Sequence, residues 1–158
     1  MRSKDWSLMG SSFTRFHDKG FWSRDHLLEV WLRLAALNLP REAYAGGWLR
    51  HVRDEWLLQS SGMFGGYITP NLDQLADTPE KVEQLLAVSD RTIEAVRRCG
   101  ETVPAAALNL IADSGTFTQD YPVDYLEEIH DAFCRLLRRE LTWDVSSSPT
   151  LPTRKEEN

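Results

Sequence analysis

The stretch "SRDHLLEVWLRLAALNLP", residues 23–40, decides the fold that this sequence predicts. Ten of the positions 24–39 are apolar, and the polar residues Asp25, Glu29 and Arg33 follow one another at four-residue spacing. A helix with so narrow a polar stripe is mostly buried, since apolar side chains cover the rest of its surface. Pro40 ends the pattern, because proline cannot continue a helix. We therefore expect a central helix here.

Four further segments have helical periodicity. They span residues 46–62, 77–100, 103–115 and 121–141. The second is the best delimited, with Thr78 suited to the N-cap, Pro79 to the first turn and Gly100 to the position after the end. No segment alternates with period two for long enough to indicate a strand. The sequence thus predicts an all-α protein, a single-domain bundle of about five helices.

The two ends of the chain differ from this pattern. Residues 1–20 form an extension rich in aromatic side chains, which continue into the start of the helical domain at 21–144: Trp6, Phe13, Phe16, Phe21 and Trp22. Two interpretations remain open, a clamp over the bundle or an arm that binds a partner. Residues 145–158 have few apolar side chains, so we expect a short disordered tail.

Composition excludes several classes of protein. The chain of 158 residues is 42% hydrophobic and 27% charged, as in ordinary globular proteins. Its net charge of −6 argues against a nucleic-acid partner. The absence of a long apolar run and of a signal-like N-terminus argues against a membrane. Cys99 and Cys134 lack C-x-x-C spacing, which favours buried reduced thiols and a cytoplasmic location.

The segment "SSGMFGGYITP", residues 60–70, holds three glycines between two predicted helices. It matches neither the phosphate-binding P-loop nor the dinucleotide pattern, because the lysine and the glycine spacing of those motifs are missing. Gly62 suits a helix end, and the paired glycines that follow suit a turn. Phe64 and Tyr67 would then either pack onto the bundle or form an exposed recognition surface, since aromatic residues often anchor interfaces.

An acidic run follows the glycine-containing segment. It consists of Asp73, Asp77, Glu80 and Glu83. Acidic residues stabilise the first turn of a helix, which is one explanation for the run. The other is an acidic face for a basic partner, which would speed association. With Phe64 and Tyr67, these four acids are the candidate partner-binding residues.

Glu127, His130 and Cys134 lie along one edge of the last predicted helix. Glu-x-x-His is half of the pattern that holds metals in carboxylate-bridged bundles, and the complete pattern needs a second copy with two more glutamates. The looser groupings of His26 with Glu29, and of His51 with Asp54 or Glu55, do not supply it. We therefore predict no metal, no cofactor and no catalytic residue, with Cys134 as an inert core thiol.

These observations favour a non-enzymatic protein that binds another protein. The specific expectation is an immunity-type inhibitor that binds and neutralises a toxin or an enzyme, because the domain is small, acidic and rich in aromatic side chains. The alternative is a helical enzyme or ligand-binding protein with a carboxylate/histidine metal site.

Overall fold

The computed structural model describes residues 10–111 and 117–152. It contains a helix in each segment where the sequence predicts one. These helices are α1 (Asp25–Leu37), α2 (Gly47–Gln59), α4 (Pro79–Arg97), α5 (Ala105–Ile111) and α6 (Val123–Leu137). Two single-turn elements connect α1 to α2 and α2 to α4, namely η2 (Arg41–Tyr44) and α3 (Leu72–Leu75).

The prediction of an all-α fold is wrong, because the described residues also form two small sheets. In the first, β1 (Ser11–Phe16) pairs antiparallel with β2 (Lys19–Arg24), and β5 (Thr150–Leu151) pairs parallel with β2. In the second, β3 (Thr102–Val103) pairs antiparallel with β4 (Tyr121–Pro122). The protein therefore has a mixed α/β fold.

The β1–β2 hairpin could not be predicted from the sequence, because neither face of it is consistently apolar or polar. Small polar side chains point inward, and Ser12, Thr14 and Ser23 are fully buried. Phe13 and Trp22 face each other across the strands on the other face, with ring centroids 5.2 Å apart. An alternation of apolar and polar residues, on which strand prediction relies, is therefore missing.

The ends of the chain also depart from expectation. The predicted boundary between the N-terminal extension and the helical domain, after residue 20, falls inside β2 and so divides the hairpin. Trp6 lies outside the described residues. The disorder predicted for residues 145–158 is contradicted at Thr150–Leu151. These two residues form β5, and the Leu151 side chain is buried.

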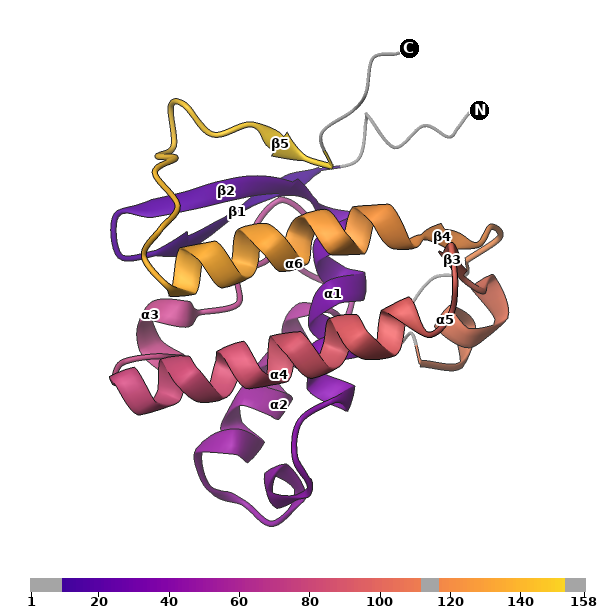
Figure 1. Ribbon diagram of the computed structural model, residues 1–158, viewed down its shortest axis with the longest axis horizontal. Helices are drawn as coiled ribbons and strands as arrows, with labels where there is room; N and C mark the ends of the chain where they lie inside the picture. Colours follow the sequence, from indigo (N-terminus) through magenta and orange to yellow (C-terminus); the bar gives the residue numbers. More distant parts are fainter. Residues whose placement is uncertain (1–9, 112–116, 153–158) are drawn as a thin grey trace.

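α1 is the central helix, as predicted. Its side chains Leu27, Leu28, Trp31 and Leu32 are fully buried. Figure 1 shows α1 running across the direction of α4 and α6, with the β1–β2 hairpin along the opposite side of α6 from α4. Phe133 of α6 packs edge-on against Trp31, with centroids 5.9 Å apart. α1 therefore joins the sheet side and the helical side of the protein into one core.

α4 and α6 lie side by side and run in opposite directions (Figure 1). The predicted cap of α4 is confirmed, since the Thr78 side chain accepts a hydrogen bond from the Lys81 amide. Gly100 follows the helix with a φ of +97°, a conformation that glycine adopts without strain. Leu108 is the only α5 side chain that is buried, so most of this short helix faces solvent.

Candidate functional site

Side chains from three elements hold the segment of residues 60–70, which is named the glycine loop from here on. Asp25, at the start of α1, accepts a hydrogen bond from the Gly66 amide at 2.7 Å. The Ser12 hydroxyl accepts one from the Ile68 amide at 3.0 Å and donates its own proton to Asp25 at 2.6 Å. Gln59 accepts a third from the Thr69 amide at 3.0 Å. β1, α1 and α2 thus fix the backbone of one loop.

Two side chains of the fixed loop project into solvent. Tyr67 is 84% exposed and Met63 is 75% exposed. Phe64 is half-buried and packs against the core, so it supports the loop from below. Gly66 has a φ of +84°, which fits its predicted role in a turn. The structure therefore combines a rigid backbone with an exposed aromatic tip.

The four acids of the candidate partner-binding set differ in their contacts. Asp73 accepts a hydrogen bond from the His17 amide at 2.7 Å and lies 3.9 Å from the Arg15 guanidinium. Asp77 pairs with Lys81 at 2.9 Å, and this hydrogen bond lowers the pKa of the Asp77 carboxyl. Two of the four acids are therefore already compensated by nearby groups.

Glu80 and Glu83 are exposed and form no hydrogen bond or ion pair with any residue that the structure describes. No hydrogen bond or ion pair between described residues joins either glutamate to the glycine loop. The acids and the glycine loop are therefore two separate features of the surface.

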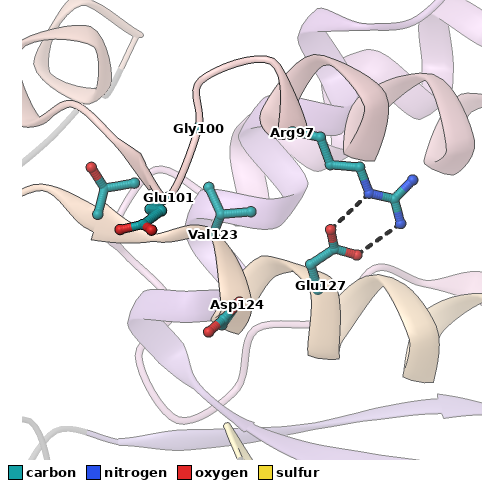
Figure 2. Close-up of a pocket in the computed structure, with 7 residues that line it drawn as sticks. Arg97, Gly100, Glu101, Val123, Asp124 and Glu127 are labelled. Atoms are coloured by element: carbon teal, nitrogen blue, oxygen red, sulfur yellow. Dashed lines mark hydrogen bonds and ion pairs between the residues drawn. The ribbon is translucent and has the colours of Figure 1, made fainter.

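An open pocket lies where α4 ends and α6 begins, and Figure 2 shows the charged side chains that line it. The Nε and Nη2 atoms of Arg97 donate hydrogen bonds to the Glu127 carboxylate at 2.7 and 2.8 Å. This pair raises the pKa of Arg97 and lowers the pKa of Glu127. The other charged walls are the carboxylates of Glu101 and Asp124. Because its only cation is already paired, the pocket is not suited to an anion.

Because Glu127 is paired with Arg97, it does not lie with His130 and Cys134 as considered from the sequence. The carboxylate next to these two residues is that of Asp90, from α4. The Nε2 atom of His130 lies 3.1 Å from the Asp90 carboxylate. One ligand atom each from Asp90, His130 and Cys134 lie within 4.8 Å of one another. Asp90 could not be identified from the sequence, because it is 40 positions from His130 and no local pattern shows which helices pair.

The other residues considered from the sequence lie apart from this cluster. His26 contacts the rings of Phe117 and Tyr121, and burial lowers its pKa to about 4. Burial raises the pKa of Glu29 to about 7, and the charge of Asp25 adds to the rise. His51 is exposed on α2. Cys99 is exposed, contrary to the expectation of two buried thiols, whereas Cys134 is buried as predicted.

Comparisons with protein-family models, with curated proteins and with solved structures found no match. Among the residues that the structure describes, no helix is long and apolar enough to cross a membrane.

Proposed function

We propose that this chain is a non-enzymatic protein-binding protein, and specifically an immunity-type inhibitor that neutralises a toxin or an enzyme in the cytoplasm. The observation that carries the proposal is the glycine loop. Its tip exposes Tyr67 and Met63, while hydrogen bonds to Asp25, Ser12 and Gln59 fix its backbone.

A loop with a fixed backbone loses less conformational entropy on binding than a mobile loop does. When a mobile loop binds a partner, each side chain that becomes immobilised costs about 0.5–1.5 kcal/mol. A backbone that is already ordered avoids part of this cost, and a tyrosine contributes a large contact area with few rotatable bonds. Tyr67 is therefore the expected anchor, with Phe64 as its support.

The charge of the chain favours a basic partner. The net charge of −6 and the uncompensated Glu80 and Glu83 would attract such a protein over a distance of about one Debye length. Asp73 and Asp77 contribute less, because each already has a cationic neighbour. We expect the acids to raise the association rate and Tyr67 to set the lifetime of the complex.

The test uses the full chain as bait in extracts of its native cells, with three variants beside the wild type. Tyr67→Ala removes the anchor, and the Glu80→Gln/Glu83→Gln double variant removes the free charges. Leu110→Ser is the matched control, because Leu110 is an 87% exposed apolar side chain on α5, outside the glycine loop. A protein captured by the wild type is then purified, and its association and dissociation rates are measured at low and high salt.

The tyrosine and the two glutamates should affect different rate constants. Tyr67→Ala should speed dissociation about thirtyfold at any salt, which corresponds to about 2 kcal/mol for a buried aromatic anchor. The double variant should slow association at low salt only. Equal dissociation rates for wild type, Tyr67→Ala and Leu110→Ser would overturn the assignment of the loop. A purified partner whose activity is unchanged in the complex would overturn the inhibitor assignment.

A further inference from the structure

The cluster of Asp90, His130 and Cys134 joins two helices and lies outside the glycine loop. His130 and Cys134 are four residues apart on α6, so their side chains share one face of that helix. Asp90 reaches them from α4. The thiol of Cys134 is buried, the His130 side chain is 16% exposed and the Asp90 side chain is 61% exposed. The cluster therefore has a buried end and an end that opens to solvent.

From this geometry we propose that Asp90, His130 and Cys134 bind one zinc ion, with the fourth coordination position open to solvent. Cysteine sulfur, histidine nitrogen and carboxylate oxygen are the three kinds of ligand that zinc takes in proteins. Sites with three protein ligands and one exchangeable position are common for this ion. The proposal is independent of the glycine loop and does not use its residues.

The distances suit a tetrahedral ion. Zinc–ligand bonds of about 2.0–2.3 Å at tetrahedral angles place the ligand atoms about 3.3–3.5 Å from one another. His130 Nε2 and the Asp90 oxygen are already 3.1 Å apart. The widest separation in the cluster is no more than 4.8 Å, so closure requires a shift of about 1 Å. Asp90 is the ligand best able to move, because its side chain is the most exposed of the three.

The surroundings hold the ligands and select the metal. The Trp31 ring packs edge-on against the imidazole of His130, with centroids 5.8 Å apart, and so restricts its orientation. A buried thiol among the ligands disfavours Mg²⁺ and Ca²⁺, which prefer oxygen atoms, and favours zinc. Burial, followed by the Asp90 charge, raises the pKa of Cys134 to about 11. Binding of zinc therefore forms a zinc–sulfur bond and releases the thiol proton to solvent.

The experiment uses the full chain, treated with chelator, reduced, and then freed of chelator. Zinc binding is measured by calorimetry. Cobalt(II) serves as a spectroscopic substitute, because thiolate coordination gives a charge-transfer band in the near ultraviolet and tetrahedral geometry gives strong visible bands. The ligand variants are Asp90→Asn, His130→Gln and Cys134→Ser. The matched controls are Cys99→Ser, which removes the exposed thiol, and Glu127→Gln, which removes the carboxylate one turn before His130.

We expect one zinc ion per chain and a charge-transfer band that Cys134→Ser abolishes. Asp90→Asn and His130→Gln should each weaken zinc binding at least about tenfold and reduce the visible bands, since each removes one ligand of the ion. Both controls should bind zinc as the wild type does. Asp90→Asn decides the question if Cys134→Ser fails to fold, because Asp90 is exposed. No binding at millimolar zinc, or binding that depends on Cys99 rather than on Asp90 and His130, would overturn the proposal.

Discussion

The hydrogen bonds of Asp25 allow a direct test of how the glycine loop is fixed. Asp25 is 7% exposed, and its carboxylate accepts hydrogen bonds from the Ser12 hydroxyl and the Gly66 amide. A hydrogen bond to a charged group contributes about 1.5–3 kcal/mol, and its loss leaves the buried donor unsatisfied. Asp25→Ala should therefore lower the free energy of unfolding by about 3–5 kcal/mol. This is a large share of the about 5–15 kcal/mol that holds a typical domain folded.

Asp25→Asn gives a milder version of the same test. The amide keeps one oxygen acceptor, but its NH2 group must face either Ser12 or Gly66, and the Gly66 amide can only donate. We expect a loss of about 1–3 kcal/mol, which remains measurable if Asp25→Ala does not fold. Asp124→Ala is the matched control, because Asp124 also lies in the first turn of a helix but is exposed. Its loss should stay below about 1 kcal/mol.

Urea denaturation measures these losses, and hydrogen exchange locates them. The amides of Gly66 and Ile68 should exchange faster in Asp25→Asn than in the wild type, whereas amides in the middle of α4 should change only with global stability. Equal losses for Asp25→Ala and Asp124→Ala, or unchanged protection at Gly66 and Ile68, would refute the reasoning.

Three further predictions concern the core, the hairpin and pH. Trp31→Ala should cost about 3–5 kcal/mol in urea denaturation, and a loss below about 1 kcal/mol would contradict the central position of α1. Gly20→Ala should cost about 1–3 kcal/mol or more, because a Cβ there would lie 2.1 Å from the Thr14 carbonyl oxygen. A neutral stability effect would contradict this hairpin register. The pKa of Glu29 is raised from 4.5 to about 7, so the stability that its protonated form contributes is complete below pH 4.5 and is lost as pH rises to about 7. Glu29→Gln should therefore match the wild type near pH 4 and exceed it above pH 7 by about 1–2 kcal/mol, after discounting for partial exposure. If the stability of Glu29→Gln and of the wild type changed with pH in parallel, this prediction would be contradicted.

The helices could be predicted from the sequence because their signals are local. Thr78, Pro79 and Gly100 delimit α4 through contacts within a few residues of the chain. The apolar faces of α1 and α6 repeat at helical spacing, and the side chains that form the apolar stripe of α6 are all buried: Leu126, Ile129, Phe133, Leu136 and Leu137. Such patterns need no knowledge of what a helix packs against.

The strands could not be predicted, because their stability comes from distant contacts. In β1 and β2 the buried positions hold small polar residues as well as Phe16 and Phe21, so hydrophobic patterning gives no clear strand signal. β5 has only two residues, and its pairing with Trp22 and Ser23 depends on a chain segment more than 120 positions away in sequence. Tertiary structure decides such elements, and local propensity does not.

The same limit applies to the two candidate sites. Sequence reasoning found Tyr67 and the glycines, but not the Asp25 carboxylate that fixes Gly66 from 41 positions away. It grouped His130 and Cys134 with Glu127, which shares their helix, and predicted no metal site there. In the structure Glu127 binds Arg97, and the carboxylate next to His130 belongs to α4. A helical pattern shows which residues share one face of a helix, but it does not show which other helix packs against that face.

α1 supports both candidate sites at different points along its length. Asp25 holds the glycine loop at the first turn, and Trp31 packs against His130 about 9 Å further along the axis, at 1.5 Å for each residue. A rigid buried helix keeps both contacts in place at once, yet the two sets of functional side chains lie on other elements. Changes in Tyr67 should therefore leave zinc binding intact, and changes in Asp90 should leave protein binding intact. Trp31→Ala, in contrast, should weaken zinc binding as well as the fold, because it removes the ring that orients His130.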